Sequence, residues 1–250
     1  MTKKVLWCVA VMTWSSMNVA LAEDKVTVGL TADLFSKYVW RGQDIVDNWV
    51  LQPSAGIGYR GFTGTIWGNM DLTGEVVGEG QFNEIDLSLD YSHKFPGQDL
   101  LGYSVGVIHY DFVNTHFAAT DEVYGALTTS VPLSPVLRWY YDFDEIKGSY
   151  IQLSVGHTIE KLQQWRDDCY CSVQVGASVA YGTAGYNEGY FGVDEGAFND
   201  LTLSAGLPFC LGKWTIKPSI AYSMMLDDDI RAATRKSDNL WGGLSASVSF

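Results

Sequence analysis

The sequence predicts an all-β protein, a closed antiparallel transmembrane β-barrel of about twelve strands that follows a cleaved signal peptide. Three observations predict this class. Segments of about ten residues alternate apolar and polar side chains along most of the chain. The connections between these segments alternate between short and long, and the final residue is the aromatic Phe250. A closed barrel also pairs every backbone N–H and C=O group, which lipid cannot do.

Composition and charge narrow the class of protein and of partner. The 250 residues suit one all-β domain or two small domains, and 47% hydrophobic against 18% charged residues exclude a disordered chain. The 26 glycines and the 14% aromatic residues favour strands and turns. The formal net charge of −13 argues against a nucleic-acid partner, because phosphates require a basic surface.

The first 22 residues read as a secretory signal peptide. Lys3 and Lys4 precede a short apolar run, Val5 to Thr13, and the small-residue segment Ala20 to Ala22 provides a cleavage site. The run is too short for the ~20 residues that a membrane-spanning helix needs. We therefore expect a signal peptide over 1–22 and one barrel domain over 23–250, exported to the bacterial outer membrane.

The alternation defines the expected strands. It is plainest from Ile85 to Ser92, where every second residue is apolar. It fades in 101–111, where Tyr103 shares a face with His109 and Asp111, so a bulge is expected there. The expected strands are 26–35, 50–59, 63–72, 83–93, 101–111, 121–130, 136–143, 149–159, 171–181, 199–208, 213–225 and 239–250. In the last of these, the residues expected to face lipid are Leu244, Ala246, Val248 and Phe250.

The connections assign the two ends of the barrel. Short connections, such as Arg60 to Phe62 and Phe209 to Gly212, are expected to face the periplasm, and longer ones, such as Gly182 to Phe198, the outside. Two connections break this rule. Asp144 to Gly148 is short where a long loop is expected, and Glu160 to Tyr170 is long where a short turn is expected.

Polar residues on the inner face would line the lumen. Acidic residues outnumber basic ones there, and rings of Asp and Glu favour cations in a pore. The alternative is that these acids pair with the basic residues and with water inside a plug. The pore-lining candidates are Asp33, Asp71, Glu84, Asp86, Asp90, Arg138, Asp142, Asp200 and Lys217.

Two further features predict structural roles. Arg41 at a strand end is expected to reach inward to a carboxylate such as Asp33 or Asp71 and brace the wall, with Gly42 supplying a turn of positive φ. Export to an oxidising compartment favours a disulfide, for which Cys169 and Cys210 are the candidate pair. Three unpaired cysteines, with Cys171 as the third, are the alternative.

No catalytic motif is present in the sequence. It contains neither a Gly-x-Ser-x-Gly elbow nor a His-Glu-x-x-His pair. We expect no enzymatic activity, no cofactor and no metal. A non-conducting structural or adhesive barrel and a soluble secreted β-sandwich are the alternative classes, since a sandwich would alternate in the same way.

Residues 32–112 resemble the TorF-type porin family. The resemblance rests on the strand end Tyr38–Gly42, on Gln52-Pro53, on the strand Trp67–Asp71, and on spaced tyrosines such as Tyr91 and Tyr110. It implies a small exported outer-membrane barrel that contacts lipid and lipopolysaccharide and passes small solutes; the oligomeric state is left open.

The chain end adds a second resemblance. A terminal aromatic such as Phe250 is similar to the assembly signal of bacterial outer-membrane barrels. It implies recognition by the barrel assembly machinery.

Overall fold

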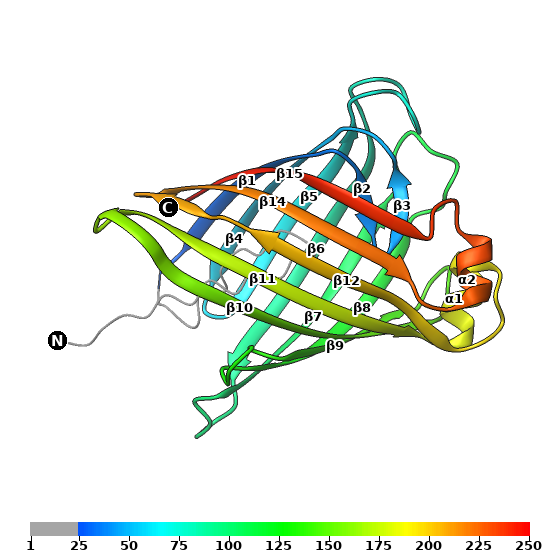
Figure 1. Ribbon diagram of the computed structural model, residues 1–250. Coiled ribbons are helices and arrows are strands. Elements are labelled where there is room, and N and C mark those ends of the chain that lie inside the picture. The colour runs from blue at the N-terminus through cyan, green and yellow to red at the C-terminus, as the bar shows by residue number, and fades with distance from the viewer. Residues whose placement is uncertain (1–24) are drawn as a thin grey trace.

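A computed structural model describes residues 25–250, and these residues form a closed barrel of twelve long antiparallel strands (Figure 1). Each strand pairs with its sequence neighbour in the wall, β1 pairs with the last strand β15, and the β10–β11 pairing completes the ring. The expected signal peptide, 1–22, lies outside the described residues. Neither described helix is long and apolar enough to cross a membrane.

The wall strands match the alternating segments of the sequence, because each of the twelve predicted segments overlaps one of them. A three-residue strand, β13 (Phe209–Leu211), continues β12 and pairs with the same two neighbours. The wall strands are β1 (Thr27–Phe35), β4 (Val50–Tyr59), β5 (Phe62–Asp71), β6 (Gln81–Lys94), β7 (Leu101–Asp111), β8 (Thr120–Thr129), β9 (Val136–Asp142), β10 (Ser149–Arg166), β11 (Cys169–Gly182), β12 (Ala197–Gly206), β14 (Trp214–Met225) and β15 (Asp238–Ser249).

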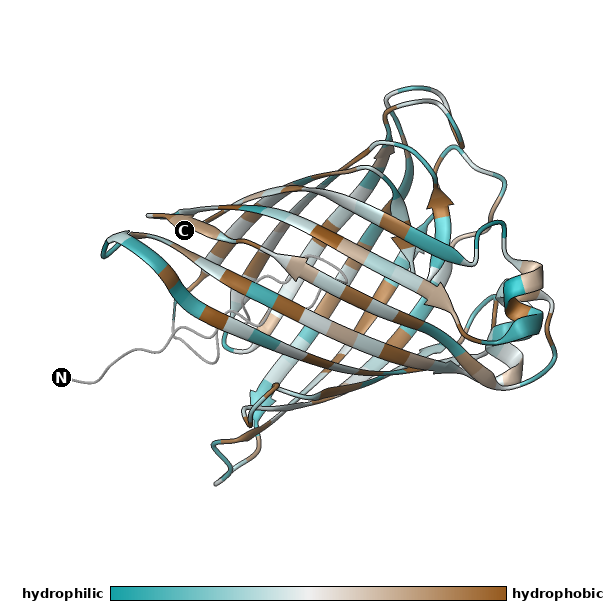
Figure 2. Cartoon of the chain, in the orientation of Figure 1, coloured by the Kyte–Doolittle hydropathy of each residue, from teal (hydrophilic) through white to brown (hydrophobic). Residues whose placement is uncertain are grey.

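Alternation along each strand separates an apolar outer face from a polar inner face. On β6, Leu87 and Leu89 are each 51% exposed, whereas Asp86 between Ile85 and Leu87 is 2% exposed. Figure 2 shows the same alternation of hydrophobic and hydrophilic residues around the wall. The molecule is thus inverted relative to a soluble protein, because its large exposed side chains are apolar and its buried ones are largely polar.

The outward face of β15 carries apolar residues, as the sequence predicts. Leu244 is 45% exposed and Phe250 is 63% exposed. Val248 lies on the same face but is only 7% exposed, since it pairs with Leu30 on one side and Trp214 on the other. Leu244 is therefore a better position than Val248 for testing whether this face contacts lipid.

The two ends of the barrel differ. One end carries tight turns, such as Arg60-Gly61, whose φ angles of 50° and 87° suit a type I′ hairpin turn. The other end carries the longer loops and two short helices, α1 (Ala184–Phe191) and α2 (Asp228–Ala233). The C-terminus lies at the turn end, away from both helices (Figure 1).

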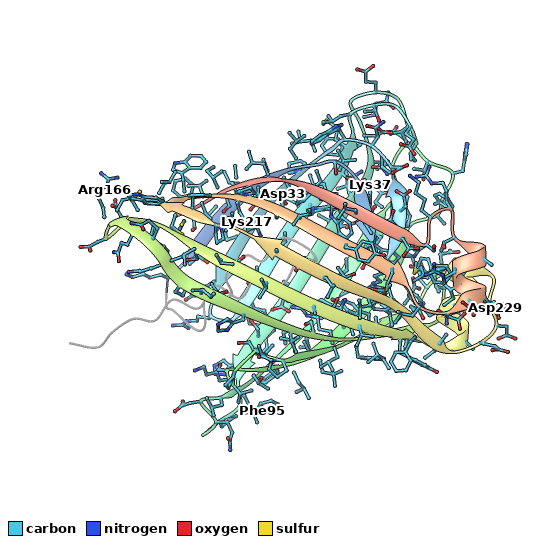
Figure 3. All side chains as sticks on the ribbon, in the orientation of Figure 1. Asp33, Lys37, Phe95, Arg166, Lys217 and Asp229 are labelled. Atoms are coloured by element: carbon cyan, nitrogen blue, oxygen red, sulfur yellow. The ribbon has the colours of Figure 1, made fainter. Side chains whose placement is uncertain are left out.

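Two connections predicted from the sequence are wrong. Glu160 to Tyr170 is not a loop, because β10 runs on to Arg166 and β11 begins at Cys169, with a register shift after Ile159. Arg166 therefore lies at the tip of a long hairpin, at the turn end (Figure 3). Phe209 to Gly212 is not the turn either, since β13 continues the wall and the chain reverses between Leu211 and Trp214.

The predicted bulge in 101–111 is also wrong. The pairing of β7 with β6 and with β8 runs without a register shift. The polar residues that interrupt the outer face lie toward the loop end of the strand, where His109 contacts Asp121 with Nδ1 and Oδ1 2.9 Å apart. Alternation therefore persists, and only the polarity of the outer face changes near the end of the strand.

The sequence prediction did not include a small hairpin inside the barrel. β2 (Tyr38–Trp40) pairs with β3 (Gln43–Val46) and forms no part of the wall. The side chains of Tyr38, Trp40 and Val46 are buried, and they form a cluster with Val50 and Trp67. We call Tyr38–Val46 the interior hairpin.

Candidate functional site: the barrel interior

The tip of the interior hairpin touches the wall. Arg41 and Gly42 have φ angles of 48° and 81°, which again suit a type I′ turn. A Cβ on Gly42 would lie 2.8 Å from Asp200 Cβ and 2.9 Å from Met225 Sδ, so only glycine fits. Asn239 Nδ2 donates to the Gly42 carbonyl oxygen at 3.2 Å. The tip is therefore held against β12, β14 and β15.

Arg41 makes a two-point ion pair with Glu122 on β8. Nη1 donates to Oε1 at 2.9 Å and Nη2 to Oε2 at 2.7 Å, and both side chains are almost fully buried. Tyr110 donates its hydroxyl to the same Oε2 at 2.7 Å. The brace predicted from Asp33 or Asp71 is wrong in its partner. The hairpin folds inward, which carries Arg41 away from Asp33 on β1 and Asp71 on β5 and toward β8.

Aromatic rings enclose the Arg41 guanidinium. Its carbon lies 4.4 Å from the Trp40 ring centroid and 4.5 Å from the centroids of Tyr140 and Tyr150. The Tyr186 ring, from α1, lies at 5.7 Å. Guanidinium groups are attracted to ring faces, more strongly where water is excluded. The contacts join the hairpin to β9, β10 and α1.

The hairpin also contacts the opposite part of the wall. The Tyr38 and Trp67 ring centroids are 5.6 Å apart, and those of Trp40 and Tyr110 are 6.3 Å apart, which reaches β5 and β7. Contacts on so many strands mean that the hairpin extends across the lumen at the loop end.

Charged loop residues cover the hairpin. Asp47 forms ion pairs with both Lys37 and Lys236, and these hydrogen bonds lower the pKa of Asp47 to about 2. Arg235 donates to Asp44 at 2.9 Å and to Glu75 at 2.7 Å. These six residues join the interior hairpin and the residues at its two ends to the loops after β5 and β14, and we call them the loop latch.

Two predicted pore-lining acids bind loop backbone instead. Asp71 accepts from the backbone N–H groups of Thr73, Gly74 and Val76 at 2.7–2.9 Å. Asp142 accepts from the backbone of Asp144 and Ile146 at 3.0 and 3.1 Å. Their carboxylates anchor the loops that follow β5 and β9.

Other predicted acids line the inner face and have hydroxyl partners. Tyr124 donates to Asp90 at 2.6 Å, and Tyr150 donates to Asp200 at 2.7 Å. Asp33 hydrogen-bonds with Ser245, and Lys217 lies on the next strand in the same row (Figure 3).

Arg138 comes from β9 and contributes to the charge environment of Asp90. The predicted acids Asp33, Asp90 and Asp200 and the predicted bases Arg138 and Lys217 therefore all lie on the inner face.

Glu84 and Asp86 project inward from β6, two residues apart on one face. Tyr38 hydrogen-bonds to Glu84. Asp86 is 2% exposed, and neither of its carboxylate oxygens has a hydrogen-bond partner among the described residues.

Sequence reasoning did not identify Glu122. Alternation in 121–130 is blurred by the neighbouring Asp121, which lies on the outer face and pairs with His109. The inward period Glu122, Tyr124, Ala126 was the available signal.

The three described cysteines are free, which contradicts the Cys169–Cys210 disulfide. They do lie on adjacent strands, as expected, but Cys210 is paired with Tyr170. Directly paired residues share one face of a sheet and sequence neighbours alternate, so Cys210 faces the side opposite to Cys169 and Cys171.

No protein-family model matches the chain, and no curated protein matches it in sequence. The TorF-type assignment therefore stays a prediction. Among solved structures, the porin NanC is similar with a TM-score of 0.52 and 11% identity, over 88% of this chain and 98% of that one.

Two further solved structures show weaker likeness. Pseudomonas putida OprB has 12% identity over 81% of this chain and 59% of its own, with a TM-score of 0.36. Salmonella typhi OmpF in complex with daunomycin has 6% identity over 90% and 97%, with a TM-score of 0.40. The likeness to NanC shows that this chain has the closed antiparallel β-barrel fold of that porin.

Proposed function

We propose that the protein is a channel of the bacterial outer membrane that passes small solutes and prefers cations. The observation that carries this proposal is the distribution of charge across the wall. The outer face is apolar, and the inner acids Asp33, Glu84, Asp86, Asp90, Glu122 and Asp200 outnumber the inner bases Arg41, Arg138 and Lys217. Acidic linings favour cations in a pore.

The apolar outer face supports residence in lipid. Residues such as Leu30, Ile57, Leu89, Leu153 and Leu203 are 46–56% exposed, and water would penalise so large an apolar surface. Lipid and lipopolysaccharide are the partners that we propose for this face, with the barrel assembly machinery acting on the Phe250 end. We propose no catalytic role.

Planar-bilayer recording tests the proposal. Purified full-length protein in KCl should produce discrete conductance steps, and a KCl gradient should give a reversal potential of the sign expected for K⁺ over Cl⁻. Silence from correctly folded protein, or preference for Cl⁻, would reject it.

A non-conducting structural or binding barrel is the second candidate. The interior hairpin favours it, because contacts with Trp67, Tyr110, Glu122 and Asn239 hold the hairpin across the lumen. Replacing residues 39–44 with a Gly-Ser linker of equal length separates the two. A silent wild type that conducts only after the replacement supports the closed barrel, whereas a conducting wild type supports the channel.

A further inference from the structure

Glu84 and Asp86 are two carboxylates with no facing cation. They lie on the same inward face of β6, 4% and 2% exposed. The charged groups that act on Asp86 are the acids Glu84, Glu122 and Asp111. The nearby guanidinium of Arg41 is engaged by Glu122 with both of its Nη atoms.

A bound ligand that supplies hydrogen-bond donors would stabilise a buried carboxylate that has no hydrogen-bond partner in the protein. Removing charged oxygens from water costs free energy that hydrogen bonds or a counter-ion must offset. Glu84 receives the Tyr38 hydroxyl, but both Asp86 oxygens are buried and have no partner among the described residues. Donors supplied from outside the protein would complete the site.

Aromatic side chains flank Asp86. Asp86 pairs directly with Trp67 on β5 and with Tyr110 on β7. Side chains directly opposite in an antiparallel pair have Cβ atoms ~4.5–5.5 Å apart. The Tyr38 ring packs on Trp67 from the interior hairpin, which lies above the acids at the loop end. The site thus combines negative charge with aromatic walls.

We propose that Asp86 and Glu84 bind the ammonium group of an organic primary amine, a solute class for the proposed cation-preferring channel, on which this inference rests. An alkylammonium group has three N–H donors, which match the two free oxygens of Asp86 and one of Glu84. Trp and Tyr rings attract its positive charge and pack against its attached carbons.

The donor set suits an ammonium group better than a metal ion. Within residues 25–250, no three His, Cys, Asp or Glu side chains form a group that could hold a metal. Calcium takes six to eight oxygen ligands, and magnesium requires near-octahedral geometry. Two carboxylates between aromatic residues supply neither arrangement.

Calorimetric titration of the full-length protein in detergent micelles tests this site. The probe is n-butylammonium chloride, with KCl at the same ionic strength as the reference. The wild type should bind the amine with one site per chain, and Asp86→Asn should weaken binding at least tenfold. Asp121→Asn is the matched control, because this acid pairs with His109 on the outer face. It should bind as the wild type does.

A second variant and a bilayer recording make the result decisive. Glu84→Gln should also weaken binding, and it replaces Asp86→Asn as the test if the latter fails to fold. Equal amine binding by wild type, Asp86→Asn and Glu84→Gln, or no binding by the wild type, overturns the proposal. Amine binding by a barrel that is silent in bilayers would reject the channel function and retain the site. A cation-selective channel that binds no amine would retain the channel function and reject the site.

Discussion

Arg41, at the tip of the interior hairpin, is joined by two hydrogen bonds to Glu122 on the far wall, 81 residues away in sequence. The pair is buried, and the rings of Trp40, Tyr140 and Tyr150 surround the guanidinium. A bidentate pair between planar groups fixes orientation as well as distance. The hairpin is therefore held at one place in the lumen.

Arg41→Ala should destabilise the barrel. The substitution leaves Glu122 buried without its counter-charge, and breaking a buried pair in this way costs ~3–5 kcal/mol. Urea unfolding in micelles would measure the loss. Arg166→Ala, which removes an exposed ion pair with Asp168, is the control and should cost no more than ~1 kcal/mol. Equal losses in the two variants would show that the Arg41 pair is no more important than a surface pair.

Gly106→Ala should break a side-chain contact across the inner wall. A Cβ at Gly106 would lie 2.6 Å from the Tyr124 ring, which crosses this glycine to reach Asp90. Overpacking of this kind costs ~1–3 kcal/mol. Gly64→Ala is the matched control, because nothing lies within 4 Å of its Cβ position. The midpoint of thermal unfolding should be compared for both variants. A midpoint for Gly106→Ala equal to that of the wild type would refute the close packing of the Tyr124 ring over Gly106.

Leu87→Arg tests the lipid-facing surface. Leu87 lies near the middle of β6 and is 51% exposed on the outer face, so a charge there should cost ~2–4 kcal/mol in a bilayer. Leu211→Arg lies near the turn end of the wall and should cost ~0–1 kcal/mol. Folding into lipid vesicles, followed by denaturant titration, measures both. Similar small costs at the two positions would mean that Leu87 does not face the middle of the bilayer.

The loop latch should resist acid. The pKa of Asp47 is lowered from 3.8 to about 2, so its contribution is complete above pH 3.8 and is lost as the pH falls through about 2. Hydrogen exchange in the loop 226–237 should therefore stay slow at pH 4 and rise in Asp47→Asn at that pH. High salt should also speed exchange, because the Arg235 and Lys236 side chains of these pairs are 51% and 42% exposed, so that salt screens their charges. Exchange that ignores both changes would rule out the latch.

The cysteines should be recovered as thiols. Cys210 faces the side of the sheet opposite to Cys169 and Cys171, so no pair has the geometry of a disulfide across these strands. Non-reducing peptide mapping of purified protein should find all three alkylated. A peptide that links Cys210 to either of the others would contradict the pairing of β11 with β13.

The wall could be predicted from the sequence because its signal is local. Leu87, Leu89 and Asp90 reveal which face is which within four residues, and closure follows from the need to pair every strand edge. The interior hairpin gives no such signal. Its strands are three and four residues long, and contacts such as Arg41 with Glu122 depend on the finished barrel.

The roles of the acids were predictable only in part. Alternation places Asp71, Asp86 and Asp142 on the inner face, but it cannot show that two of them turn to loop backbone while Asp86 has no partner. That difference depends on the conformations of the loops after β5 and β9. The sequence predicts these loops by length alone.

The reversal potential of single channels under a KCl gradient tests the central claim most directly. The acidic lumen should give a reversal potential of the sign expected when K⁺ permeates more readily than Cl⁻. Asp86→Asn combined with Asp90→Asn should move this reversal potential toward zero, while the channel still conducts. A wild-type reversal potential of zero, or of the sign expected for a preference for Cl⁻, would contradict a cation-preferring channel.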